Sequence, residues 1–380
     1  MIKVIKGLGV VVGLMCSLLV FIVVCLVAIN ATDRTKSPNT LLVETWLKQQ
    51  SIDPAQNGFV YLQAFSGTIE DVTAKEMATT LSFNDEENQL LSDYKKSCYQ
   101  TDVASCNEFI EKNNDSILQT IKAHKANITH YNKLIEMPYW QEDIQYLTPE
   151  SLFKWLPLLN LRAISELSVL INFDGATKLN ANEALLTFLT TDAQFWNMVY
   201  HSSRSIVNHM IAVSVIKSQL NFASTVAKTL DSAFVNKVTT WQTPFELTNN
   251  DFERVFSGEW QFAHNVREQM LIEVQSDEVA FYEKWLADAL YKPTDSDNLM
   301  AEYIVSLVKE PVSTSSAHTV IKPDYCSLDN YIKQLWMSRY NPIGKLFNCT
   351  VYETDYKQRL TNINTELEQL RTNLLTGTSS

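Results

Sequence analysis

The chain has 380 residues, of which 46% are hydrophobic, and its formal charge at pH 7 is −12. Nucleic-acid-binding proteins need a basic surface that displaces counterions from phosphates, so this charge argues against that class. Only nine residues are glycine. Those outside the N-terminal segment and the C-terminal tail lie too far apart to form a phosphate-binding loop or a dinucleotide-binding fingerprint, which excludes P-loop and Rossmann enzymes.

An apolar run from Gly7 to Ile29 contains 23 residues without a charge and follows Lys3 and Lys6. At about 1.5 Å per residue, a helix of this length spans the roughly 30 Å hydrocarbon core of a bilayer. A cleaved signal peptide has a shorter apolar stretch, so the run predicts an uncleaved signal anchor, although Ala31 offers a passable cleavage site. We expect residues 1–6 in the cytoplasm, a transmembrane helix at residues 7–29, and the remaining chain outside the cytosol.

Small residues recur every four positions in this run, at Gly9, Gly13 and Ser17. Such spacing lets two membrane helices approach closely, which predicts a packing face and a homodimer through the anchor. The alternative is that these residues have no packing role. Glycine is common in membrane helices in general, so its presence alone does not indicate a contact.

Residues 30–40 contain Ser37 and Pro38 and have the polar texture of a juxtamembrane linker. Apolar spacings of three and four predict that residues 41–355 form a mostly helical domain. The run Asn57–Phe65 fits either a strand or a short buried helix. Helices are predicted at residues 41–50, 203–229, 251–275, 277–290 and 299–308, with a polar break at residues 292–298.

The last segment, residues 356–380, carries a heptad seam and a tail, with apolar residues at Tyr356, Leu360, Ile363, Leu367, Leu370 and Leu374. A helix of fewer than three heptads is marginal alone in water, so we expect it to bury its apolar stripe on its own domain. The whole pattern predicts an all-α chain. Its N-terminal transmembrane helix is followed by an irregular helical bundle or a repeat-like domain of helical hairpins.

Beyond the anchor, four cysteines fall into two local pairs, Cys98 with Cys106 and Cys326 with Cys349. An even, clustered set is typical of disulfides in an oxidising compartment. Reduced structural thiols are an alternative, whereas a metal site is disfavoured because its ligands usually lie two to four residues apart. Four cysteines allow three connectivities, and the local pairing is the preferred one.

Two histidines, His201 and His209, flank the densest polar cluster, Ser202-Ser203-Arg204-Ser205. On a helix that begins at Ser205, His209 lies one turn away, which would allow a Ser/His pair. A serine nucleophile also needs an oxyanion hole, which glycine usually signals, and no glycine is near. Helix capping by Ser202 or Ser203, with a histidine at the surface or at the edge of the core, is therefore the favoured interpretation.

Acidic residues near His264 offer a second candidate, since Glu259, His264 and Glu268 could lie along one helix. The pattern lacks the second histidine of the His-Glu-x-x-His zinc motif, so a hydrogen-bonded pair is favoured over a metal site. The runs Asp85-Glu86-Glu87 and Glu142-Asp143 are interpreted as solvated helix starts and are assigned no role. The sequence therefore predicts no cofactor and no metal, and leaves His201, His209, Glu259 and His264 as weak catalytic candidates.

Besides the anchor, the chain carries several short motifs: Asn57-Gly58-Phe59-Val60-Tyr61-Leu62, Ser203-Arg204-Ser205-Ile206-Val207 with Met210-Ile211-Ala212, Gly258-Glu259, and Asn341-Pro342-Ile343-Gly344-Lys345. Together they resemble a family of signal-anchored helical proteins of the proteobacterial envelope, for which no activity is known. The resemblance implies a single-pass protein of the bacterial inner membrane whose helical domain faces the periplasm. It implies no substrate or cofactor.

These observations favour a non-catalytic, membrane-tethered module that binds another protein or supports an envelope assembly. The alternative is a hydrolase-like envelope enzyme that acts on a cell-wall or lipid substrate. A deep cleft that holds His201, His209 or His264 beside buried carboxylates would favour the enzyme, and an open surface would favour binding.

Overall fold

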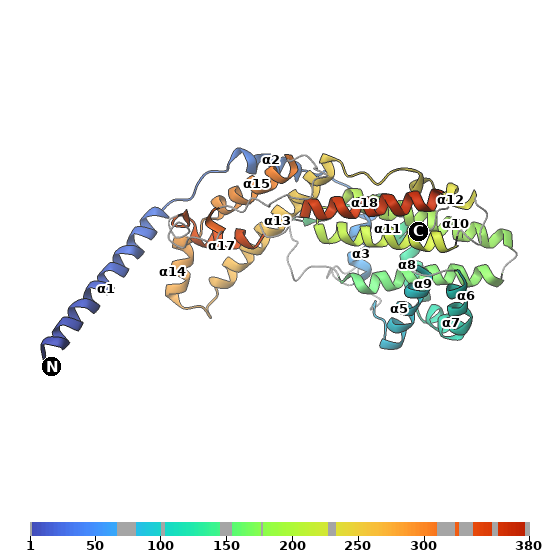
Figure 1. Cartoon of the computed structure of the whole chain (residues 1–380), viewed down its shortest axis with the longest axis horizontal. Helices are drawn as coiled ribbons and strands as arrows, with labels where there is room; N and C mark the ends of the chain where they lie inside the picture. Colours follow the sequence, from blue (N-terminus) through green and yellow to red (C-terminus); the bar gives the residue numbers. More distant parts are fainter. Residues whose placement is uncertain are drawn as a thin grey trace. The chain divides into compact units, whose positions relative to one another are not determined.

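The computed structural model describes residues 2–66, 81–99, 103–144, 154–175, 178–226, 233–309, 324–326, 337–351 and 356–376. These residues form helices and connecting segments, with one isolated bridge between Asn57 and Tyr139, so the all-α prediction is confirmed (Figure 1). The chain forms two compact units. Unit 1 contains Met1–Lys48 and Trp260–Gln358, and unit 2 contains Gln49–Glu259 and Arg359–Ser380.

Unit 1 contains the N-terminal helices and most of the helices after residue 260. They are α1 (Ile2–Ile29), α2 (Pro38–Trp46), the part of α13 (Asn249–Val274) from Trp260 onward, α14 (Phe281–Leu290), α15 (Pro293–Lys309), the short turn η5 (Asp324–Cys326) and α17 (Pro342–Val351). Helix α15 packs against α2 and α17, while α14 contacts both α1 and α17. A disulfide joins Cys326 of η5 to Cys349 of α17.

The apolar run forms most of α1, which is 28 residues long. Among the residues whose side chains the structure describes, which in α1 begin at Gly13, no helix is long and apolar enough to cross a membrane.

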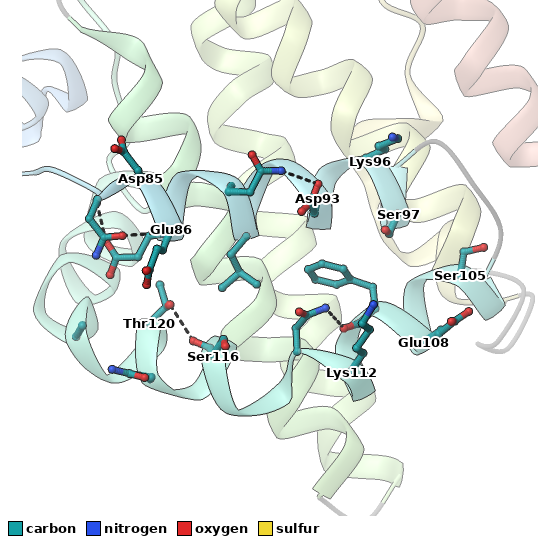
Figure 2. A pocket seen from close by; sticks show the side chains of 18 residues that line it. Asp85, Glu86, Asp93, Lys96, Ser97, Ser105, Glu108, Lys112, Ser116 and Thr120 are labelled. Atoms are coloured by element: carbon teal, nitrogen blue, oxygen red, sulfur yellow. Dashed lines mark hydrogen bonds between the residues drawn. The ribbon is translucent and has the colours of Figure 1, made fainter.

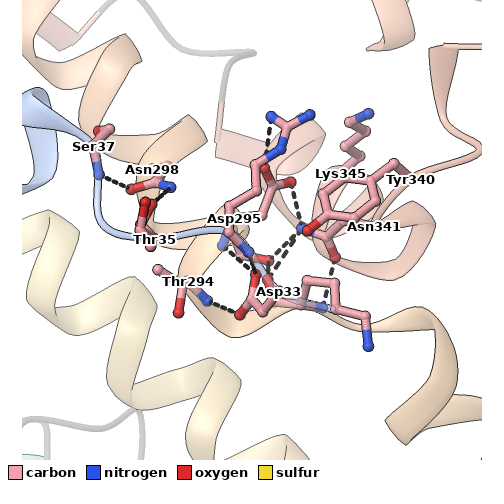
Figure 3. A network of polar contacts seen from close by, with 12 residues as sticks. Asp33, Thr35, Ser37, Thr294, Asp295, Asn298, Tyr340, Asn341 and Lys345 are labelled. Atoms are coloured by element: carbon pink, nitrogen blue, oxygen red, sulfur yellow. Dashed lines mark hydrogen bonds and ion pairs between the residues drawn. The ribbon is translucent and has the colours of Figure 1, made fainter. Parts of the chain in front are cut away.

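The polar segment after α1 differs from the free linker expected at residues 30–40, because it is bonded to α15 and the start of α17 (Figure 3). The side-chain amide of Asn30 donates to the carbonyl oxygen of Arg339, and its Oδ1 accepts from the backbone N–H of Asn341. Asp33 accepts from the backbone N–H groups of Thr294 and Asp295 at the start of α15. The end of α1 is therefore fixed to unit 1 by side-chain contacts that no local pattern encodes.

Helices α2 and α15 begin earlier than predicted. Helix α2 begins at Pro38 because the Ser37 hydroxyl caps it by accepting from the backbone N–H of Thr40. The predicted break at residues 292–298 is wrong, since α15 begins at Pro293 and carries Asp295 in its first turn. Proline, serine and aspartate favour both loops and first helical turns, so composition alone did not separate the two.

Asn341 joins the starts of α15 and α17. It adopts a φ of 50°, a left-handed conformation that asparagine tolerates better than most residues. Its buried Oδ1 accepts from the backbone N–H groups of Lys292 and Gly344, which caps α17. A Cβ at Gly344 would lie 2.0 Å from Oγ of Ser296, so only glycine fits this close approach.

Unit 2 is built on three long helices: α9 (Trp155–Gly175), α10 (Lys178–Ser202) and α11 (Ile206–Val226). Helix α10 packs against both others, and the short connections make consecutive helices antiparallel. The remaining elements are η1 (Pro54–Gln56), α3 (Gly58–Ser66), α5 (Asp85–Tyr99), α6 (Val103–Lys112), α7 (Asn114–Ala123), α8 (Lys125–Ile135), α12 (Ala233–Lys237), η4 (Thr239–Gln242), the start of α13, and α18 (Tyr356–Thr376).

The ambiguous run Asn57–Phe65 is helical, and Phe59, Leu62 and Phe65 bury one face of α3 in the core of unit 2. The terminal seam also packs on this unit. Leu360, Leu367 and Leu374 are buried, so α18 covers its own domain as expected. Residues 41–355, which were expected to form one helical domain, fall partly in unit 1 and partly in unit 2.

Candidate functional site

The cluster around His201 lies at the turn between α10 and α11. Ser205 caps the start of α11 by accepting from the backbone N–H of Val207, whereas Ser203, one of the two serines predicted to cap, donates its hydroxyl to the carbonyl oxygen of Val199 in α10. Neither hydrogen bond involves His209, as that of a serine nucleophile with its base would.

His209 is 1% exposed and lies against the ring of Tyr200, with ring centroids 4.6 Å apart. Its Nδ1 is 3.0 Å from the carbonyl oxygen of Tyr200, so this nitrogen carries the proton and donates it. Burial lowers the pKa of His209 to about 4. The residue is therefore a neutral core histidine without access for a substrate.

Two glutamates hold the first turn of α11. Glu142, buried at 2% exposure, accepts through Oε2 from the backbone N–H groups of Arg204 and Ser205, and Glu259 accepts from that of Ile206. Burial raises the pKa of Glu142 and raises that of Glu259 to about 7, against the lowering effect of these hydrogen bonds. Both carboxyls satisfy helix-start donors that would otherwise be unpaired.

Gly258 explains how Glu259 reaches this turn. A Cβ at Gly258 would lie 1.7 Å from the carbonyl oxygen of Arg204, so α13 approaches the turn at backbone contact distance. Two motifs that are far apart in the sequence, Gly258-Glu259 and Ser203–Val207, are thus parts of one structural clamp.

The other two candidates are paired with aspartates. His201 Nδ1 lies 3.5 Å from Asp251, and although burial raises the pKa of Asp251, hydrogen bonds from His201 and Thr248 bring it down to about 2. In unit 1, His264 Nδ1 lies 3.0 Å from Asp297, and the pKa of His264 is raised chiefly by that hydrogen bond. Among the described residues, no three His, Cys, Asp or Glu side chains are placed to hold a metal ion.

A buried charge network in unit 2 was not predicted from the sequence. The Nε of Arg162 donates to Asp192 at 2.8 Å, and its Nη2 donates to Glu166 at 3.1 Å. Tyr94 and Tyr99 donate to Glu166, at 2.5 Å and 2.8 Å. Burial raises the pKa of Glu166 despite the opposing effect of Arg162.

The same network reaches two more helices through Asp192. This carboxylate accepts from Tyr131 of α8 at 2.5 Å and from Gln219 of α11 at 2.7 Å. Because it joins α5, α8, α9, α10 and α11 and is almost fully buried, the network is structural: it fixes how the helices of unit 2 pack.

A groove of about 1190 Å³ lies in unit 2, between α5 on one side and α6 and α7 on the other (Figure 2). We call it the acidic groove. Its lining holds five carboxylates and two lysines, a formal charge of −3, over a small apolar floor of Leu90 and Phe109. The charged residues are Asp85, Glu86, Glu87, Asp93, Glu108, Lys96 and Lys112.

The helices that line the acidic groove are fixed by a disulfide, a capping box and a buried hydrogen bond. The Cys98–Cys106 disulfide joins α5 to α6, as the local pairing predicted. Asn84 and Glu87 form a reciprocal capping box at the start of α5, with both hydrogen bonds at 2.9 Å. Tyr94, on the inner face of α5, is bonded into the buried network. The groove is thus a preformed surface.

Comparisons with known proteins find no match: none with protein-family models, none with curated proteins and none with solved structures.

Proposed function

We propose that this chain is a single-pass, membrane-anchored binding protein of the bacterial inner membrane. Its acidic groove, in this proposal, faces the periplasm and takes a cationic segment of a protein partner. The observation that carries the proposal is the groove itself, an open and preformed surface with an excess of carboxylates.

Charge supports a cationic ligand. Carboxylates gathered on one surface raise the local concentration of positive partners and speed their association, an effect that weakens as salt is added. The groove also offers hydrogen-bonding groups, including Ser116, Gln119 and Asn113, for the backbone of an extended segment. Its openness suits a chain that lies along it rather than a small molecule enclosed within it.

The enzyme alternative lacks a comparable observation. None of the candidates His201, His209, Glu259 and His264 lines the acidic groove. Each is bonded to a structural partner, and His209 is sealed in the core. Binding is therefore the better-supported function.

The membrane and compartment parts of the proposal rest on other features. The uncharged run Gly7–Ile29 within α1 supports a single anchor, and the two disulfides suit an oxidising compartment such as the periplasm. In α1, no described atom lies within 4 Å of the position of a Cβ on Gly13, which leaves room for a second helix at Gly13. We therefore include a homodimer through the anchor. A membrane two-hybrid assay should lose association in Gly13→Ile, and retained association would contradict this part alone.

The binding proposal is tested by photo-crosslinking in intact cells. A benzoylphenylalanine at Gln119, which lines the acidic groove, should form an adduct. The same residue at Leu118, which is 44% exposed but outside the lining, should not form this adduct. Asp93→Lys should abolish the Gln119 adduct, because it reverses a charge in the lining. Glu111→Lys, an exposed acid outside the lining, is the matched control and should leave it unchanged. An adduct that survives Asp93→Lys would refute recognition by charge in this groove.

A further inference from the structure

Helix α14 exposes three aromatic side chains on unit 1. Phe281 is 83% exposed, Tyr282 is 62% exposed and Trp285 is 44% exposed. Trp285 lies one turn after Phe281 and so shares its face of the helix. Exposed apolar groups on a soluble surface are usually scattered singly, so three aromatic residues in the first five positions of one helix indicate a surface that is covered in use.

The position of α14 indicates what covers these side chains. Helix α14 packs against α1 (Figure 1). In α1, the residues from Gly13 to Val24 are exposed, Cys25 to Val27 are partly covered, Ala28 and Ile29 are exposed, and Asn30 is buried. Helix α14 contacts α1 and lies beside its C-terminal end (Figure 1), so α14 adjoins α1 near the point where this helix would leave the bilayer.

The segment that follows α1 is bonded to the later helices of unit 1. Asn30 is bonded to Arg339 and Asn341, Tyr340 donates to the carbonyl oxygen of Thr32, and Arg34 forms a 3.0 Å ion pair with Asp295. A bilayer that surrounds α1 up to Ile29 therefore meets the part of unit 1 that includes α14.

We propose that α14 lies in the interfacial layer of the membrane that holds α1, with Phe281, Tyr282 and Trp285 among the lipid headgroups and upper acyl chains. This inference rests on the proposed membrane anchor. Aromatic side chains with an apolar body and a polar tip, such as Tyr and Trp, are enriched at this depth. Insertion would hold unit 1 against the membrane surface and restrict its rotation about the anchor.

The charges on α14 favour insertion driven by the aromatic side chains over attraction to anionic lipids. The helix carries Glu283, Lys284 and Asp288, with no cluster of basic residues. Surface helices that depend on anionic lipids carry such clusters. The contact should therefore persist in bilayers of zwitterionic lipid and at high salt.

The test uses the full chain in nanodiscs of phosphatidylcholine, with and without bromine on the acyl chains to quench tryptophan fluorescence. Brominated lipid should quench part of the emission of the wild type. Trp285→Phe should lose most of that quenching. Trp46→Phe, which removes a half-buried tryptophan of α2, should retain it.

Two results would separate the possible failures. If the chain is not retained in nanodiscs through gel filtration, the anchor proposal fails and the inference fails with it. If the chain is retained but wild type and Trp285→Phe are quenched equally, the anchor stands and the inference is overturned.

Discussion

Replacing Arg162 with methionine tests what holds unit 2 together. The guanidinium is 3% exposed and contacts two carboxylates, those of Glu166 and Asp192, that are fully buried. Methionine fills similar volume but leaves both carboxylates without their positive partner. Breaking a buried ion pair in this way costs about 3–5 kcal/mol. The hydrogen bonds from Tyr94 and the other donors remain. We therefore expect the unfolding free energy at pH 7.5 to decrease by an amount within that range.

The pH dependence of this defect gives a second measurement. Without Arg162, the folded-state pKa of Glu166, already raised by burial, rises further above its unfolded value. When the pKa of a carboxyl is higher in the folded than in the unfolded protein, the protein becomes less stable as pH rises, because the unfolded chain releases its proton first. The defect of Arg162→Met should therefore be largest at pH 7.5 and smaller at pH 5. Adding Glu166→Gln and Asp192→Asn should recover most of the lost stability at pH 7.5.

Urea unfolding of the full chain in detergent micelles, followed by tryptophan fluorescence, measures these changes. Trp196 reports on the network because its indole N–H donates to Tyr131. The matched control is Lys217→Met, which removes an exposed ion pair with Glu366 and should change stability by about 1 kcal/mol or less. An Arg162→Met protein as stable as wild type at pH 7.5, or one whose defect grows as pH falls, would refute the reasoning.

Two further predictions concern the clamp at the start of α11. Since the pKa of Glu259 is raised from 4.5 to about 7, it should make wild type less stable as pH rises through this interval, by at most about 3 kcal/mol. Urea titrations at pH 4.5 and 7.5 measure how the unfolding free energy changes with pH, and Glu259→Gln should lack the contribution of this carboxyl. The same change in wild type and in Glu259→Gln would contradict the prediction. Gly258→Ala should cost about 1–3 kcal/mol or more, because its Cβ would overlap the carbonyl of Arg204. Gly13→Ala, with open space around it, should leave thermal unfolding of unit 2 unchanged.

Local patterns predicted the helices well where one face is apolar. The stripe of Leu360, Leu367 and Leu374 is buried in α18, and the spacing of the cysteines favoured both disulfides. The early part of α15 was missed because the residues that start a helix also favour loops.

The parts that carry the proposed function depend on distant contacts. The run Asp85-Glu86-Glu87 was correctly expected to start a helix, but its place in the acidic groove requires α6 and α7 to pack opposite α5. Arg162 and Glu166 lie four apart in an otherwise apolar helix, which could have signalled a buried pair, whereas Asp192 comes from another helix. Such placements follow from tertiary packing and are not encoded in spacing along the chain.

The most direct test of the central claim, a membrane anchor with both units outside the cytosol, is alkaline phosphatase fused after Ser380. This reporter needs disulfides that form only in an oxidising compartment. The account predicts an active fusion, and an inactive one when residues 7–29 are deleted. A full-length fusion that is expressed at a normal level but inactive would contradict the proposed topology, and with it the periplasmic role of the acidic groove.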